Sequence, residues 1–329
     1  MKKENKLRKT SVGGQALIEG IMMNGPKGAA MAVRGKDGEI VTEFQTVKHI
    51  RDKIKFLGWP FIRGIVNFIE TMIMGYKSLM RSAELSGQLE DEEDPENMSK
   101  VDKWLSDHMG PKLMGVITGI ASVLAMALGV FLFVFLPTFI VGLIDDKLFG
   151  SSLSAYRALF EGLIRAVIII LYMYAVSKMK DIKRVFMYHG AEHKTIACYE
   201  SGMELTVENV RKCRRFHPRC GTSFIFIILI TSILVSSAVI ILFPIFQNSD
   251  YRLQWILVKI LGILPVVTGI SYELIKYAGK HDNIATRIFS APGLWMQRIT
   301  TSEPDDSMIE VGITAVKAVI TDNPEDDSL

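Results

Sequence analysis

Four long apolar stretches place the strongest constraint on what this chain can fold into. The first of them has no charged residue between Leu113 and Asp145. A helix of about 20 apolar residues crosses the roughly 30 Å hydrocarbon core of a bilayer. The sequence therefore predicts a mainly α-helical, polytopic membrane protein with about four transmembrane helices, at residues 113–144, 158–176, 223–246 and 253–275.

Basic residues are distributed unevenly between the predicted loops, and this distribution predicts the orientation. Residues 177–222 contain ten lysines and arginines, whereas residues 247–252 contain only Arg252. Short loops rich in lysine and arginine stay on the cytoplasmic side. We therefore expect a multi-pass protein of the plasma membrane, with the loop at 177–222 and both termini in the cytoplasm.

The remaining segments form a small cytoplasmic part and its connections. Residues 1–55 are expected to be a β-rich unit, in which Ala29–Arg34 and Glu39–Val47 form a hairpin around a turn at residues 35–38. Residues 12–26 suit a further strand. The other expected segments are a membrane-associated helix at 56–84, an acidic linker at 85–112, and a cytoplasmic C-terminal segment at 276–329 with an amphipathic helix at 311–320.

A possible metal-binding motif, H-x-x-E-H, lies in the long basic loop as His189, Glu192 and His193. On a helix, residues four apart share a face, so both imidazoles can bind one ion while Glu192 lies on the adjoining flank. Neutral imidazole is a common zinc ligand, and inverzincin metalloproteases use the same order of residues. The competing interpretation is that these histidines cap a helix or bind headgroup phosphate.

A second pair of donors, His217 and Cys220, precedes the third apolar stretch. Residues 179–199 are expected to continue the second span as one helix, and a short helix from Thr206 to about Phe216 would bring the second pair back toward the first. A divalent ion, expected to be zinc, would then have either four ligands in a closed structural site or three ligands and an open position. Carboxylates that could act as ligands or as acceptors for imidazole N–H groups are Glu200, Glu204 and Glu208.

Two functions remain open from these residues. In the first, the protein is a metal-dependent hydrolase at the cytoplasmic face, with Glu192 as the catalytic proton acceptor. In the second, it is a non-enzymatic scaffold or regulator with a structural metal. A transporter is disfavoured, because Glu161 and Arg165 are expected to pair with each other and Lys259 to extend toward the membrane surface.

Expected partners follow from the same reading. The lipid bilayer is the expected environment, no nucleic acid is expected, and both the substrate and a homo-oligomeric state are left open.

Four motifs taken together resemble one known family. They are GGQALIEGIMM from residue 13, HGAEHK from residue 189, HPRCGTS from residue 217 and QRITTSEP from residue 297. In this order they resemble the YqhQ-like family of uncharacterised bacterial membrane proteins, known as domain of unknown function 1385. The resemblance covers nearly the whole chain, and it implies a predicted metal-dependent enzyme whose site includes His189, Glu192, His193, His217 and Cys220.

Overall fold

The computed structural model describes residues 9–45, 50, 54–60, 62–88, 111–149, 156–281, 283–321, 323 and 326–327. Most of the expected acidic linker therefore lies outside the described residues. The chain folds as two compact units, each assembled from separate parts of the sequence. Unit 1 contains residues 1–88, 173–227 and 268–329, and unit 2 contains residues 89–172 and 228–267.

Unit 1 is built on a four-stranded antiparallel sheet in which each strand pairs with the next along the chain. The expected hairpin is present as the last two strands, and residues 12–26 supply a second hairpin instead of one strand. The turn between the first two strands places Glu19 at a φ of 49°. The strands are β1 (Gly13–Leu17), β2 (Gly20–Gly25), β3 (Gly28–Arg34) and β4 (Ile40–Gln45).

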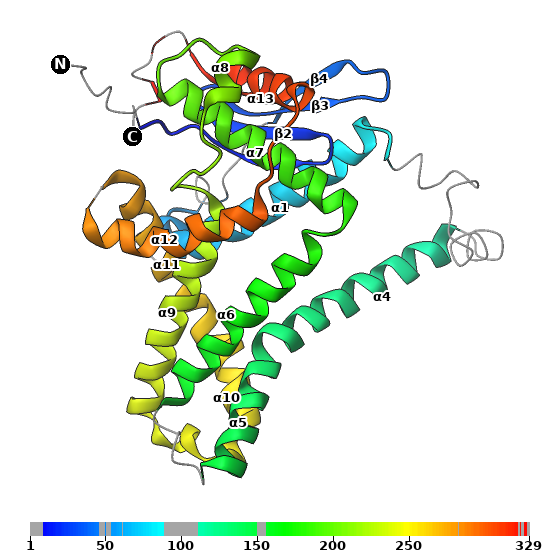
Figure 1. Ribbon diagram of the computed structural model, residues 1–329. Helices are drawn as coiled ribbons and strands as arrows, with labels where there is room; N and C mark the ends of the chain where they lie inside the picture. The colour runs from blue at the N-terminus through cyan, green and yellow to red at the C-terminus, as the bar shows by residue number, and fades with distance from the viewer. Residues whose placement is uncertain are drawn as a thin grey trace. The chain divides into compact units, whose positions relative to one another are not determined.

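Both faces of the sheet are covered by helices, as the alternation of side chains along β2 shows. Ile21 and Met23 pack with helices α7 (Lys180–Glu200) and α13 (Asp306–Val319). Met22 faces the opposite side and packs with helix α1 (Ile62–Leu85). Because neighbouring residues of a strand point to opposite faces, a strand with apolar residues at every position must lie between two layers. Figure 1 shows α7 and α13 beside the strands.

The helices of unit 1 differ from the sequence expectation in two places. The expected continuous helix through residue 179 is interrupted, because three residues separate the end of α6 (Arg157–Val176) from the start of α7. The segment after residue 282, for which no helix was predicted, is helix α12 (Ile284–Thr300), started by a capping box at Asn283. The expected second loop helix is confirmed as the shorter α8 (Val207–Lys212), with Thr206 as its N-cap.

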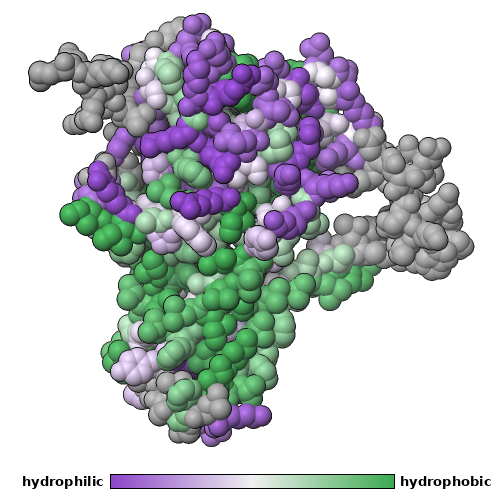
Figure 2. All heavy atoms as spheres, in the orientation of Figure 1, coloured by the Kyte–Doolittle hydropathy of each residue, from purple (hydrophilic) through white to green (hydrophobic). Residues whose placement is uncertain are grey.

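Unit 2 contains the apolar part of the molecule, and the expectation of four membrane-spanning helices is confirmed. Four described helices are long and apolar enough to span a bilayer, at Gly119–Lys147, Arg157–Val176, Phe224–Leu242 and Arg252–Ala278. Hydrophobic side chains gather over the visible face of these helices (Figure 2). Their helical segments are α4 (Pro111–Val130), α5 (Leu136–Leu148), α6, α9 (Gly221–Leu242), α10 (Arg252–Val258) and α11 (Leu264–Lys280), with single π-helical turns at Phe131–Phe135 and Lys259–Ile263.

A buried group of charges in unit 2 differs from both expectations for its residues. Glu161 is hydrogen-bonded to Arg157 (3.2 Å) and to Lys259, and not to Arg165. Arg165 instead donates to the Phe133 carbonyl at 2.7 Å. Lys259 is buried, and its ammonium group contacts Glu161 and Thr138 instead of extending outward. A charge away from water requires close partners, so one carboxylate here compensates two cations.

This cluster makes a prediction about stability. Glu161→Gln should destabilise the protein by roughly 3–5 kcal/mol, because it leaves the buried Arg157 and Lys259 without a counter-charge. The double variant Glu161→Leu with Lys259→Met removes opposite charges together and should lose less. Thermal unfolding of the purified protein in detergent checks this order, which would be contradicted if the double variant were the less stable of the two.

Candidate functional site

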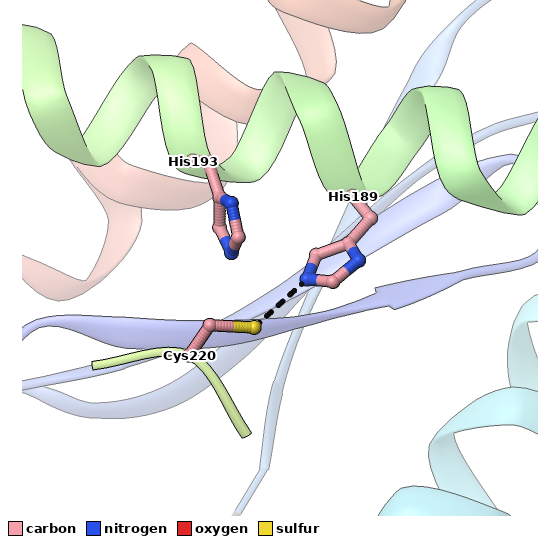
Figure 3. Close-up of side chains that lie close together, drawn as sticks. All are labelled: His189, His193 and Cys220. Atoms are coloured by element: carbon pink, nitrogen blue, oxygen red, sulfur yellow. Dashed lines mark hydrogen bonds between the residues drawn. The ribbon is translucent and has the colours of Figure 1, made fainter. Parts of the chain in front are cut away.

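Three of the predicted metal-binding residues converge in unit 1. His189 and His193 lie one turn apart on α7, and Cys220 lies in the loop immediately before α9. Each offers one ligand atom, and the three atoms lie within 4.8 Å of one another. His189 Nε2 is 3.2 Å from Cys220 Sγ, and both rings point toward the sulfur (Figure 3). We call these three residues the triad.

Backbone carbonyls fix the orientation of both imidazoles. His189 Nδ1 lies 2.8 Å from the Thr300 carbonyl oxygen, and His193 Nδ1 lies 2.6 Å from that of Arg215. A carbonyl only accepts hydrogen bonds, so each Nδ1 carries the proton and each Nε2 presents a lone pair. His193 Nε2 is buried and has no hydrogen-bond partner within the described part of the chain. Metal-binding histidines in proteins are commonly held by this kind of contact at the second ring nitrogen.

The environment favours the protonation states that a metal requires. Burial lowers the pKa of His193, because the imidazolium ion is costly away from water. Burial alone would raise the pKa of the Cys220 thiol, but the proximity of His193 and the contacts with Thr222 outweigh it and lower that pKa. Neutral imidazole and thiolate are the forms that bind zinc.

Glu192 lies on the side of α7 that faces strand β1. Its carboxylate accepts a hydrogen bond from the Gly14 N–H, while the atom Oε2 is buried with no partner among the described residues. Burial raises the pKa of Glu192 to about 8, and Cys220 adds to the rise, while His189 and Gly14 oppose it. A cation bound nearby would favour the ionised carboxylate.

Gly14 allows this close approach of the helix to the sheet. A methyl group at position 14 would lie 2.6 Å from the Met22 carbonyl oxygen and 3.2 Å from the carboxyl carbon of Glu192. Any larger residue would displace either the strand or the carboxylate. The glycine-rich start of β1 is therefore part of the wall of the site.

His217, the fourth predicted ligand, lies near the triad but is engaged elsewhere. Its ring centroid is 5.7 Å from that of His193, and its Nε2 is 3.5 Å from Glu200 Oε2. Glu200 also accepts hydrogen bonds from Arg219 and from the backbone N–H of Thr10. Burial opposes ionisation of Glu200, but these partners prevail and lower its pKa to about 2.

Gln297 holds the loop that carries His217 and Cys220. Its Oε1 accepts from the His217 N–H and its Nε2 donates to the His217 carbonyl, both at 2.8 Å. Gln297 is fully buried on α12. A primary amide can accept from one N–H and donate to one C=O at the same time. The Gln297 side chain therefore pairs with the His217 backbone in the way that a neighbouring β-strand would.

A cavity of ≈ 310 Å³ lies against the site. Its lining combines the start of β1 with polar side chains, including Asn24, Glu192, His193, His217 and Cys220. The cavity therefore lies beside His193, Cys220 and Glu192, on one side of the triad.

Comparison with known proteins places the chain in a family. The model of a family described as "Protein of unknown function (DUF1385)" matches residues 59–322. The chain belongs to this family. It is also 34% identical over 312 residues to the "Uncharacterized protein YqhQ" of Bacillus subtilis (strain 168), covering 94% of this chain and 92% of that protein. No solved structure matches. The resemblance inferred from the motifs is confirmed.

In this DUF1385 protein, the predicted site residues have separate surroundings. His189, His193 and Cys220 meet, Glu192 lies beside them, and His217 contacts Glu200. Of the other carboxylates considered as acceptors for imidazole N–H groups, Glu204 and Glu208 are exposed at the surface.

The contributions of Gln297, Gly14 and the two carbonyls were not anticipated. Gln297 was visible only as a member of a family motif, and backbone carbonyls leave no signal in a sequence. For Gly14, the adjacent pair Gly13–Gly14 at the start of a strand was the available signal, because glycine in a strand often marks a close approach.

The contacts of Glu200 predict a pH dependence. A carboxylate whose folded pKa is below its ordinary value of 4.5 stabilises the fold above that value, and this contribution disappears as the pH falls toward about 2. Glu200→Gln should therefore cost about 2–3 kcal/mol at pH 7, and the difference from the wild type should shrink on acidification.

Thermal unfolding of both proteins between pH 7 and pH 3 measures the effect. Glu204→Gln, which removes an exposed carboxylate from the loop after α7, is the matched control and should behave like the wild type. A constant difference between Glu200→Gln and wild type across this range would contradict the assignment.

Proposed function

We propose that this protein is an integral membrane metalloprotein in which His189, His193 and Cys220 bind one zinc-type divalent ion. The observation that carries the proposal is the arrangement of the imidazoles. In both imidazoles, the Nδ1–H group points at a backbone carbonyl and Nε2 points toward Cys220 Sγ. Mixed imidazole and thiolate donors are typical of zinc, whereas magnesium and calcium prefer oxygen.

We further propose that the ion is catalytic and that the protein is a metal-dependent hydrolase. Three protein ligands leave a fourth coordination position open, as in catalytic zinc sites. A bound divalent ion supplies Lewis acidity and lowers the pKa of a water molecule toward neutrality. Glu192, which lines the cavity and has one unpaired oxygen, would accept a proton and return it to the leaving group.

The surroundings of His217 support three ligands over four. Its Nε2 is directed at Glu200, and its backbone is clamped by Gln297. To complete a closed four-ligand site, the His217 ring would have to turn away from Glu200 and Arg219. Each of these side chains would then lose one partner in a buried position. The scaffold or regulator with a structural ion therefore requires a rearrangement that the catalytic alternative does not.

The location of the site follows from the charge distribution. Unit 1 contains the basic loop at 177–222, and the positive-inside rule supports a triad at the cytoplasmic face of the membrane. Protease chemistry is the weaker form of the hydrolase proposal, because only the five-residue motif supports it.

The metal content of the purified protein is the first test. Wild-type protein should contain about one zinc-type ion per chain, and His189→Ala, His193→Ala and Cys220→Ser should each lose it. His217→Ala should retain the ion if three ligands suffice. His281→Ala, at an exposed histidine that stacks on Tyr277, is the control. Elemental analysis after dialysis gives the stoichiometry, and metal-free wild type would end both versions of the proposal.

Glu192→Gln separates the catalytic ion from the structural one. The substitution preserves size and should preserve the ion, but it removes the proton acceptor, which typically contributes 10²–10⁴-fold to a rate. The measurements are metal content, hydrolysis of ester, amide and phosphodiester probes, and complementation of a strain lacking its own copy. Glu204→Gln, which alters an exposed carboxylate in the loop after α7, is the control. Full complementation by metal-replete Glu192→Gln protein would favour the scaffold.

A further inference from the structure

A second and larger cavity lies between helix α1 and the sheet of unit 1. Its volume is ≈ 1170 Å³, which exceeds the roughly 300–1,000 Å³ of typical small-molecule sites. Its walls come from α1, from β3 and β4, and from Tyr272 of α11. We call this cavity the α1 cleft.

The α1 cleft adjoins the cavity at the triad. Ser11 and Asn24 line both of them, at the end of the sheet where β1 begins and β2 ends. Because α7 and α1 cover opposite faces of the sheet, an elongated molecule that bends around this end of the sheet could place one end beside Glu192 and the other end along α1.

The polar side chains in the walls of the α1 cleft largely satisfy one another. Arg81 pairs with Glu43 at 2.6 Å, and Asn67 Nδ2 donates to the Tyr272 hydroxyl at 2.6 Å. Gln45 likewise donates to Ser78 at 2.8 Å. Groups that are already paired gain little from a polar ligand, so what the walls offer is their apolar surface, contributed by Met31, Ile50, Ile73 and Met74.

The two ends of the combined site thus differ in chemistry. Beside the triad, His193 Nε2 and Glu192 Oε2 are buried without hydrogen-bond partners among the described residues. The unsatisfied polar groups lie at the triad, whereas the extended apolar surface lies in the α1 cleft. A ligand that matches both has a polar group at one end and a long apolar chain at the other.

The outer face of α1 indicates where such a molecule would come from. Ile69, Met72, Ile73 and Tyr76 form one stripe at helical spacing and are 50–66% exposed. An exposed apolar stripe on an amphipathic helix suits the interface of a bilayer. Ile73 belongs both to this stripe and to the lining of the α1 cleft, so the two apolar surfaces are continuous.

We infer that the α1 cleft binds the apolar chain of a membrane lipid and presents the polar end of that lipid to the triad. The substrate class of the proposed hydrolase is then a membrane amphiphile. The chemistry in this inference rests on the proposed function, but the binding of lipid does not.

Photo-crosslinking in a bilayer tests the binding. The full-length protein is reconstituted into nanodiscs of phosphatidylcholine and phosphatidylglycerol that contain a trace of phosphatidylglycerol with a diazirine near the end of one acyl chain. After illumination, labelled peptides are mapped by mass spectrometry. We expect labelling of the β3–β4 peptide at Met31 and Gln45, which face the α1 cleft, in addition to labelling of the outer stripe of α1.

A pair of neighbouring substitutions provides the control. Thr71→Trp adds bulk at an exposed position that lines the α1 cleft, and it should reduce labelling of Met31 several-fold. Met72→Trp adds similar bulk one residue later, on the outer stripe, and should leave labelling of Met31 unchanged. Thermal unfolding of both variants shows that each remains folded.

Each outcome decides the question. Labelling confined to the outer stripe, or labelling of Met31 that persists in Thr71→Trp, overturns the inference. A dimer in nanodiscs with the stripe protected and Met31 unlabelled overturns it in favour of a second copy. His193→Ala and Glu192→Gln proteins should still be labelled at Met31. If the wild type lacks metal but is labelled, only the proposed function fails; if it holds metal but is unlabelled, only this inference fails.

Discussion

The burial of helix α7 is the constraint on which the rest of unit 1 depends. This helix carries a lysine, a histidine and two glutamates into the interior, where a polar group without a partner costs about 1–3 kcal/mol. Lys194 satisfies this requirement through the Arg211 carbonyl and Glu303, and Glu200 through Thr10, His217 and Arg219. The partners come from the N-terminus, from the loop after α8, and from the segment after α12. Pairing α7 therefore fixes three distant parts of the chain around it.

Two side-chain atoms of α7 lack such a partner in the described part of the chain, and both belong to residues of the candidate site. Among the described residues of α7, the side-chain atoms that remain buried and unpaired are His193 Nε2 and Glu192 Oε2. They belong to adjacent residues, and both residues line the same cavity. In a helix where even a buried lysine has two partners, two neighbouring orphans are better explained by a ligand that completes them than by a packing defect. A metal ion at the proposed site would satisfy the nitrogen, and a proton on the carboxyl group would satisfy the oxygen.

The sequence could predict those parts of the structure that depend on local pattern. Apolar runs identify spans because each helix meets lipid independently of the others, and H-x-x-E-H identifies a shared face because helix geometry is fixed. The different surroundings of His217 and Cys220 could not be predicted from local pattern. They depend on Glu200 and Gln297, which contact the same loop from other parts of the chain. The same holds for Lys259, whose buried position is set by Glu161 on another helix. Long-range pairing of polar groups leaves no periodic signal, so it was the part that required the structure.

The order of residues in the motif also has a structural reason. In the alternative order H-E-x-x-H, the carboxylate would occupy position 190. In this fold that position faces the segment after α12, where the Ser302 N–H donates to the Phe186 carbonyl at 2.8 Å and any side chain at Gly190 would collide with the Ser302 carbonyl. Position 192 faces β1, where Gly14 leaves room for a carboxylate. The packing of α7 between the C-terminal segment and the sheet therefore excludes a carboxylate directly after the first histidine and accommodates one directly before the second. The resemblance to inverzincins in residue order can thus arise from this packing alone, without shared chemistry.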